Sequence, residues 1–582
     1  MLKNLLTFLS KNKLLTLLIV SAFVFFMITI WPSGNQYCYK AKCGLFYWGS
    51  NEHDAIWHLA LAETAFKQIP FILPIFSGTK LMGYNYLTDF IIYLLKLLHI
   101  PTSSSYFQLI PFLWFITFTY LLIRIARHIK NSPLFIGWLL FFCYFGASFS
   151  YFFTLYHQKT IWGSSSLVAM QSGNMLTNMP FALSLLILLE ILILIKEHVL
   201  TWKTSFILGF LVSVNLGLKL YSGLISVLVI FLYYFFDLLQ KKKKIDREDI
   251  YSLIKKYLVI ATFFFFAVFI FYNPFESIKS GSIFIFSPFA TMHSMIEEPI
   301  FFYLKDLTNA RYYLYAHRGL LSPRLLGIEL FSTALFLFFS LGLRIFGLLY
   351  WIVKMLQKKL NAFDIAVFIS ALSAFVFLVL FIQKGQWWNV IQFYYYSLFL
   401  MNIFTALFFY ELLHKQKNKI IVFGISFLVI ILALPPNIDI LKTFTSFPSS
   451  GYVSNEELKA LDFLKKQPKG IVFTPFYEEK PLQYDPQPLY SKKSSSYISA
   501  FSGKQVYYAD EIQLSLFGIP YEARRDRIQN GDCSVLREVT YIYLIKNEHS
   551  TFVDTCINNP EFSGKQIFEN DSVIIYLERL SK

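Results

Sequence analysis

Four side chains that can transfer protons or bind metals lie close together in the segment YWGSNEHDAIWHLALAETAFKQIP, residues 47–70. They are Glu52, His53, Asp54 and His58. Carboxylates and imidazoles serve in general acid–base catalysis and, in larger sets, in metal binding. Because the surrounding sequence is strongly apolar, this segment is the first candidate for chemistry in the chain.

The simplest interpretation of this segment is structural. Asn51 is a good helix N-cap, and Glu52 and Asp54 then occupy the first turn, where the helix dipole favours carboxylates. Apolar residues follow at positions 56, 59, 60 and 66, which predicts a short amphipathic helix on the outer face of a membrane. Trp48 and Trp57 would anchor that helix at the interface.

A metal site is a second interpretation. Asp54 and His58 are four residues apart and therefore share one face of a helix. One carboxylate and one imidazole supply half of a site, and no second pair of this kind stands out elsewhere in the sequence. The sequence therefore assigns no metal ligands, and it leaves a divalent metal cofactor open.

The composition indicates a polytopic membrane protein. Of 582 residues, 56% are hydrophobic and 15% are charged, whereas about a quarter of the residues in soluble proteins are charged. Apolar runs of about 16 to 25 residues alternate with short polar clusters. The first run, 14–31, lacks a following small-residue cleavage site, so we expect a retained span with a cytoplasmic N-terminus. The predicted fold class is mainly α, a bundle of about 11–12 spans in the cell membrane.

Basic clusters between the apolar runs predict the orientation of the bundle. By the positive-inside rule, four regions fall on the cytoplasmic side: 196–203, 241–249, 354–364 and 414–419. The net charge of +16 then reports orientation, and no nucleic-acid partner is expected. Within a multi-span domain of 1–440, the large first external loop is 32–85. If 86–100 spanned fully, the basic run 124–130 would fall outside, so we expect 86–100 to be a partial or interfacial element.

Residues 449–582 differ in composition and predict a small extracytoplasmic α/β domain. The segment SNEELKALDFLKKQ begins with Ser454 and has Glu457 three residues later, which is a capping box. Four segments rich in β-branched and aromatic residues predict strands: 470–476, 504–510, 540–547 and 572–579. If the first loop and this domain are both extracytoplasmic, two cysteine pairs can form disulfides, and otherwise they stay reduced: Cys38 with Cys43, and Cys533 with Cys556.

The first loop and the overall layout resemble the GT-C superfamily, integral-membrane glycosyltransferases that use polyprenyl-phosphate-linked sugars. The residues that carry the resemblance are HDAIWHLALAETAFKQIPF…GYNYLTDFIIYLL, an aspartate followed by a Y-x-Y segment that enters the next hydrophobic element. The resemblance implies that Asp54 is the general base of an inverting sugar transfer, with Glu52 as the competing candidate. It also implies a lipid, glycan or protein acceptor on the external face.

Candidate substrate-binding residues lie mostly in the other predicted external loops. Cations suit a leaving phosphate, and the candidates are Lys219, Arg311, Arg318, Arg324 and Lys384. Aromatic and amide side chains suit a sugar, and the candidates are Trp388, Asn389, Gln392 and Tyr394, with His58 from the first loop. The alternatives are cations at the lipid headgroups and an interfacial aromatic belt.

Two other classes of function stay open. A transporter or flippase for lipid-linked glycans usually shows internal repeats and charged residues deep in its spans, and the sequence has no evident repeat. A non-enzymatic envelope assembly protein would lack a carboxylate that faces a lipid-sized groove. The absence of a P-loop or a Rossmann glycine pattern disfavours nucleotide-dependent chemistry.

Overall fold

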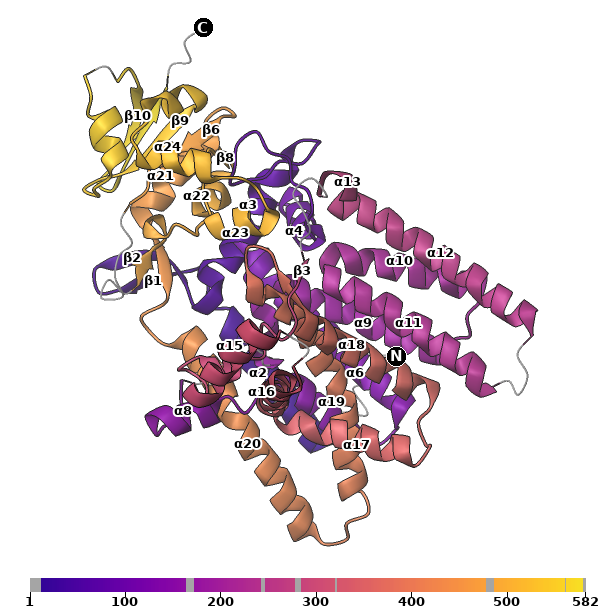
Figure 1. The fold of residues 1–582 in the computed structure, drawn as a ribbon. Coiled ribbons are helices and arrows are strands. Elements are labelled where there is room, and N and C mark those ends of the chain that lie inside the picture. The colour runs from indigo at the N-terminus through magenta and orange to yellow at the C-terminus, as the bar shows by residue number, and fades with distance from the viewer. Residues whose placement is uncertain are drawn as a thin grey trace.

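The computed structural model describes residues 12–163, 172–241, 246–277, 284–319, 322–477, 486–560 and 562–578. A helical bundle carries a smaller α/β region at one end (Figure 1). That region is formed mainly by the C-terminal segment, and the first loop lies between it and the bundle.

Within the described residues, nine helical stretches are long and apolar enough to cross a membrane. They are α2 (Lys13–Ile30), Thr102–Ile129 with α6 (Ile110–Ile129), α9 (Met179–Glu197), α11 (Leu220–Lys241), α12 (Arg247–Tyr272), Pro323–Leu356 with α16 (Pro323–Leu341) and α17 (Ile345–Leu356), α18 (Ala362–Leu380), Trp387–Leu413 with α19 (Ile391–Leu413), and α20 (Lys419–Thr445). Two shorter apolar helices, α7 (Pro133–Phe145) and α10 (Trp202–Leu218), join them. Together they fit the predicted bundle of about 11–12 spans, and the chain is a multi-pass membrane protein.

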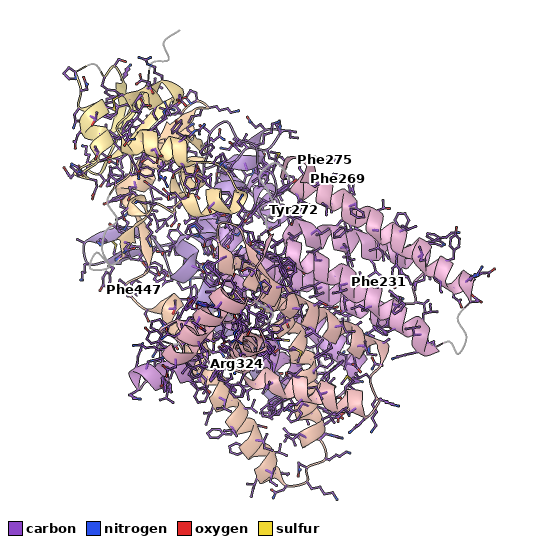
Figure 2. All side chains as sticks on the ribbon, viewed as in Figure 1. Phe231, Phe269, Tyr272, Phe275, Arg324 and Phe447 are labelled. Carbon is purple, nitrogen blue, oxygen red and sulfur yellow. A yellow bond between two sulfur atoms is a disulfide. The ribbon has the colours of Figure 1, made fainter. Side chains whose placement is uncertain are left out.

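Aromatic side chains on the outside of the bundle face away from the protein. Phe231 on α11 and Phe269 on α12 project from its surface (Figure 2), and they are 44% and 49% exposed. Helix α12 packs mainly against α10 and leaves most of its surface uncovered. Such a surface suits hydrocarbon, because lipid tails are as apolar as the side chains themselves.

Helix α4 (Leu87–Leu97) is too short to cross the bundle. Its 11 residues reach about 16 Å, half of a hydrocarbon core of about 30 Å. The chain then runs along α6, whose Arg124 donates from Nη2 to Glu197 Oε2 at the end of α9, at 2.6 Å. The basic run 124–130 therefore lies at the same end as the cluster 196–203, which removes the conflict in the predicted topology.

The bundle has two chemically different ends. The turns that follow α17 and α19 carry lysines at 358, 359, 415 and 417, and Lys196 and Lys241 lie at the ends of α9 and α11, so we name this end the basic end. The opposite end carries the first loop and the C-terminal region, and we name it the domain end (Figure 1).

The C-terminal region shares a sheet with the first loop. Strand β2 (Lys42–Tyr47) pairs with β5 (Gly451–Ser454) in a four-stranded sheet of order β1-β2-β5-β7. Strand β1 (Asn35–Tyr39) precedes β2 in a hairpin closed by the disulfide Cys38–Cys43, and β7 (Gln487–Pro488) forms the far edge. The two segments therefore build one structure, although about 400 residues separate them.

A second sheet has the order β10-β11-β9-β6-β8. The four strands predicted from the sequence are all present: β6 (Ile471–Phe473), β8 (Gln505–Val506), β9 (Tyr541–Ile545) and β11 (Val573–Leu577), and β10 (Lys565–Glu569) joins them. The predicted capping box begins α21 (Asn455–Lys466): the Glu457 backbone N–H donates to Ser454 Oγ at 3.2 Å, and the Ser454 backbone N–H donates to Glu457 Oε2 at 3.0 Å. The second predicted disulfide, Cys533–Cys556, is also formed.

Helix α3 (Asp54–Thr64) corrects the prediction of an interfacial helix. Every residue from Ala55 to Thr64 is buried, because α22 (Tyr497–Ser502) and α4 both pack against α3. Trp48 and Trp57 are each 1% exposed, so neither is a membrane anchor.

The predicted N-cap is also wrong. Asn51 is buried and donates from Nδ2 to Ser33 Oγ at 2.9 Å, so it ties the first loop to the end of α2. The residue that precedes α3 is His53, which makes no side-chain cap hydrogen bond. The His53 side chain is used elsewhere, as described next.

Candidate active site

A cavity of about 420 Å³ lies at the domain end, where three parts of the chain meet. The first loop supplies Asp54 and His58, turns of the bundle supply Lys219 and a row of amides, and α23 (Glu511–Phe517) of the C-terminal region supplies Gln513 and Phe517. The volume falls within the range of small-molecule sites in proteins.

Asp54 presents a partly exposed carboxylate to this cavity. Its side chain is 46% exposed, and its Oδ1 lies 3.1 Å from His53 Nδ1. The other ring nitrogen of His53, Nε2, lies 3.3 Å from Oδ1 of Asp510, which is completely buried. Burial disfavours the charged ring, but hydrogen bonds to Asp510 and Asp54 and their charges outweigh it and raise the pKa of His53 to about 10.

His58 lies one helical turn after Asp54 and also lines the cavity. Its Nδ1 lies 2.7 Å from Oδ1 of Asp89 on α4, and Asp89 is fully buried. Burial raises the pKa of Asp89, and the charges of His58 and Lys219 act against that rise. The Asp89 carboxylate fixes the orientation of the His58 ring.

Lys219 supplies a cation to the same cavity from the turn between α10 and α11. It is 9% exposed, and burial lowers its pKa to about 8, against the opposing charges of Asp54 and Asp89. Among the described residues Lys219 forms no ion pair, and its nearest aromatic contact is the Tyr221 ring, whose centroid lies 5.9 Å from Nζ. A buried cation that has Asp54 and Asp89 nearby but no direct ion pair in the described structure can also bind an anionic ligand.

Amide groups form one wall of the cavity. Gln383 Oε1 accepts hydrogen bonds from Tyr221 OH at 3.0 Å and from Asn389 Nδ2 at 2.9 Å, and Gln392 Nε2 donates to Asn389 Oδ1. Gln392 Oε1 is buried and has no hydrogen-bond partner among the residues that the structure describes. This wall therefore offers both fixed and free polar groups.

Aromatic rings complete the lining. Trp57 Nε1 donates to Tyr84 OH at 2.9 Å, and Phe517 packs edge-on against Trp57. Trp388 is 42% exposed at another part of the wall. Apolar ring faces beside amides are the surfaces on which sugars stack and form hydrogen bonds.

Six of the predicted site residues meet in the cavity. They are Asp54, His58, Lys219, Trp388, Asn389 and Gln392. Glu52 does not line it, because Lys492 of the C-terminal region pairs with its carboxylate. Tyr394 is buried and hydrogen bonds with Ser340 Oγ at 2.8 Å, and the cavity is lined instead by its neighbour Tyr395.

The predicted loop cations lie elsewhere. Arg311, on α15 (Lys305–Arg318), donates to Glu329 at 2.7 Å and to Glu297 at 3.0 Å, so carboxylates of the protein already bind it. Arg318 and Arg324 are exposed, and neither lines the cavity. Lys384 is exposed in the loop before α19 and does not line it either.

Sequence reasoning missed several residues of the site. Asp510 belongs to a predicted strand and carries no catalytic motif, and Tyr84, Asn85 and Gln513 look like ordinary loop residues. The Y-x-Y segment is the one signal that marks Tyr84 and Asn85. No local pattern marks Asp510 or Gln513.

The geometry does not assemble a metal site from the predicted half-site. Asp54 contacts His53, whereas His58 contacts Asp89. In the described ranges, no group of three or more His, Cys, Asp or Glu side chains is placed to hold a metal ion.

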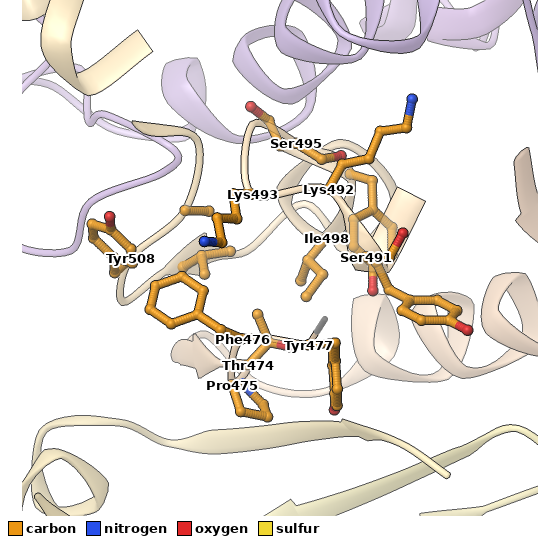
Figure 3. Close-up of a pocket in the computed structure, with 15 residues that line it drawn as sticks. Thr474, Pro475, Phe476, Tyr477, Ser491, Lys492, Lys493, Ser495, Ile498 and Tyr508 are labelled. Atoms are coloured by element: carbon orange, nitrogen blue, oxygen red, sulfur yellow. The ribbon is translucent and has the colours of Figure 1, made fainter. Parts of the chain in front are cut away.

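A second pocket lies in the C-terminal region (Figure 3). Its volume is about 40 Å³, and its lining includes Tyr477, Lys493 and Tyr508. A space of this size holds a water molecule or two, so it is too small for a sugar.

Comparisons with known proteins give structural similarity alone. No protein-family model and no curated protein matches the chain. Among solved structures, ArnT from Cupriavidus metallidurans bound to undecaprenyl phosphate is 9% identical with a TM-score of 0.47, over 98% of this chain and 99% of ArnT. The Archaeoglobus fulgidus oligosaccharyltransferase tethered with an acceptor peptide is 12% identical with a TM-score of 0.49, over 92% of this chain and 70% of that one.

Arabinofuranosyltransferase AftD from Mycobacteria is 11% identical with a TM-score of 0.45, over 97% of this chain and 41% of AftD. TM-scores below 0.5 at such low identity do not identify a donor, an acceptor or a catalytic residue, and we infer these from the cavity itself.

Proposed function

We propose that the protein is a membrane glycosyltransferase that moves a sugar from a polyprenyl-phosphate-linked donor to an acceptor, with Asp54 as the general base. The observation that carries this proposal is a cavity that holds a partly exposed carboxylate and a buried lysine with no ion pair in the described parts of the chain. A carboxylate base for the proton of the nucleophile and a cation for the leaving phosphate are the two charges that such a transfer needs.

The reaction assigns a role to each charge. Asp54 accepts the proton of an acceptor hydroxyl or amine as that atom attacks the anomeric carbon. The bond between the anomeric carbon and the phosphate oxygen breaks, and its electron pair stays on the polyprenyl phosphate. Lys219 stabilises the negative charge of that phosphate. Attack from the face opposite to the leaving group inverts the anomeric configuration.

The rest of the lining suits a sugar. Asn389 and Gln392 are placed to form hydrogen bonds with hydroxyl groups, and Trp388 offers a ring face for stacking. His58, held by Asp89, supplies one more polar group beside Asp54. We assign these four residues to substrate binding.

The orientation of the bundle supports catalysis on the external face. Lysines gather in turns and at helix ends at the basic end, and by the positive-inside rule that end faces the cytoplasm. The domain end is then extracytoplasmic, where the disulfides Cys38–Cys43 and Cys533–Cys556 are stable. On this orientation the N-terminus is cytoplasmic and the cavity lies near the outer leaflet.

Substitution of the base tests the proposal. Full-length protein in nanodiscs is mixed with a panel of polyprenyl-phosphate-linked hexoses and pentoses and a crude envelope extract as acceptor, and free polyprenyl phosphate is measured by mass spectrometry. We expect release by the wild type and at least a 100-fold slower rate for Asp54→Asn, which keeps the shape of the side chain. Glu52→Gln is the matched control, and a wild-type rate for Asp54→Asn would reject the assignment of the base.

A further inference from the structure

We propose that Asp510, in the C-terminal region, is a positioning residue that acts on Asp54 through His53. The C-terminal region would then complete the active site, in addition to covering it. This inference rests on the proposed role of Asp54 as the base.

The three side chains form a continuous chain of contacts. Asp54 Oδ1 lies 3.1 Å from His53 Nδ1, and His53 Nε2 lies 3.3 Å from Asp510 Oδ1. Ionised carboxylates only accept hydrogen bonds, so each ring nitrogen must carry a proton. His53 is therefore an imidazolium that donates in both directions, and it is unsuited to act as the base itself.

The charges of the three groups explain why the second carboxylate is present. His53 and Asp510 neutralise each other, so Asp54 keeps its own negative charge for the incoming proton. With His53 and Asp54 alone, the base would be one half of a neutral ion pair. Asp54 Oδ2 has no hydrogen bond within the described part of the chain, and it remains available to the acceptor.

Asp510 is itself held in place by its own region. Its Oδ2 accepts from Ser496 Oγ at 2.6 Å, and its Oδ1 accepts from the Gln513 backbone N–H at 3.2 Å as the N-cap of α23. Its backbone φ is 57°, in the left-handed region that Asp and Asn tolerate best among residues other than glycine. Asn is also as good an N-cap as Asp. Asp510→Asn therefore removes the charge and keeps the local structure.

The experiment measures kcat and KM for polyprenyl-phosphate-sugar cleavage by full-length Asp510→Asn, His53→Gln and the double variant. A mutation that displaces a catalytic group by about 1 Å from its productive geometry can cost about 100-fold in rate. We therefore expect kcat to fall roughly 10- to 100-fold, with KM for the donor within about twofold of wild type. The double variant should be no slower than the slower single variant, because the two residues act as one unit.

Controls separate a positioning role from a structural one. Asp532→Asn alters another aspartate cap in the C-terminal region, away from the cavity, and should keep the wild-type kcat. Melting temperatures close to wild type for Asp510→Asn exclude loss of the fold. A wild-type kcat for Asp510→Asn, or losses that multiply in the double variant, overturns the inference.

Asp54→Asn in the same assay distinguishes the two proposals. If Asp54→Asn is inactive while Asp510→Asn and His53→Gln match the wild type, the base assignment stands and only the positioning role fails. If Asp54→Asn is active, the base assignment fails, and the positioning role that rests on it fails too.

Discussion

A single buried lysine is the most informative side chain of this protein after Asp54. Lys219 is 9% exposed and forms no ion pair among the described residues, and burial costs more than the more distant charges of Asp54 and Asp89 return. A phosphate on the donor would supply the missing anion. Binding of a donor phosphate would therefore explain why the Lys219 charge is buried, although its burial by itself lowers stability.

Replacement of Lys219 should weaken binding of the donor. A charge-assisted hydrogen bond contributes about 1.5–3 kcal/mol, so Lys219→Met should raise the KM for a polyprenyl-phosphate sugar about 10- to 100-fold. Lys384→Met is the matched control, because that lysine is exposed and lies outside the cavity lining. Equal KM values for wild type and Lys219→Met would contradict a phosphate contact.

His53 should make stability depend on pH in the alkaline range. The folded protein raises the pKa of His53 from 6.5 to about 10, so its stabilisation is fully present below about pH 6.5 and is lost as the pH rises through 10. The unfolding free energy of the wild type should exceed that of His53→Gln by about 3 kcal/mol at pH 6, with the difference vanishing by about pH 10.5. Thermal melts in detergent across this range measure it, and the exposed His549→Gln serves as control. A difference that grows with pH would refute the assignment.

At the scale of elements, Glu63 joins three of them. On α3 it is 4% exposed, and its Oε2 lies 2.5 Å from Lys96 Nζ on α4 and 3.2 Å from Lys465 Nζ on α21. Burial opposes the charged form, but Lys465 and Lys96 outweigh it and lower the pKa of Glu63. This stabilisation is therefore present above the ordinary pKa of glutamate and is lost in acid.

Removal of the Glu63 charge should loosen the junction between α3, α4 and α21. Glu63→Gln leaves two lysines without their carboxylate, which should cost about 2–3 kcal/mol of unfolding free energy. The exposed pair of Glu456 with Lys459 is the control, and Glu456→Gln should cost less than about 1 kcal/mol. Equal melting temperatures for the two variants would show that Glu63 does not hold the junction.

Local elements could be predicted from the sequence, whereas contacts between distant segments could not. The capping box of Ser454 and Glu457 and the strands of the second sheet follow from short patterns. The burial of α3 does not, because α22 covers it from more than 400 positions away. The contact of His53 with Asp510 spans 457 residues and has no local signature.

The same distinction applies to the candidate site. Asp54 was predicted from its family-like setting, and Lys219 as one of several cations that suit a leaving phosphate. The loop arginines were predicted by type alone, and Arg311 instead binds Glu329 and Glu297. The residue type alone does not show whether a cationic side chain is already ion-paired with a carboxylate of the same protein.

At the scale of the whole molecule, the two ends of the bundle should face different compartments. In intact cells, a membrane-impermeant maleimide should label Lys565→Cys in β10 and leave Lys417→Cys, between α19 and α20, unlabelled. Both positions are exposed, so accessibility within the protein does not differ. Permeabilised cells give the control, in which both label, and the reverse pattern in intact cells would invert the proposed orientation.

The shared sheet has a consequence for the order of synthesis. Strand β2 leaves the ribosome long before β5, its partner about 400 residues later, and at roughly 5–20 residues per second the wait is about 20–80 s. Throughout that interval β2 is an unpaired edge of the kind that aggregates. The hairpin that it forms with β1, locked by Cys38–Cys43, would preserve the nascent loop until the last part of the chain arrives to finish it.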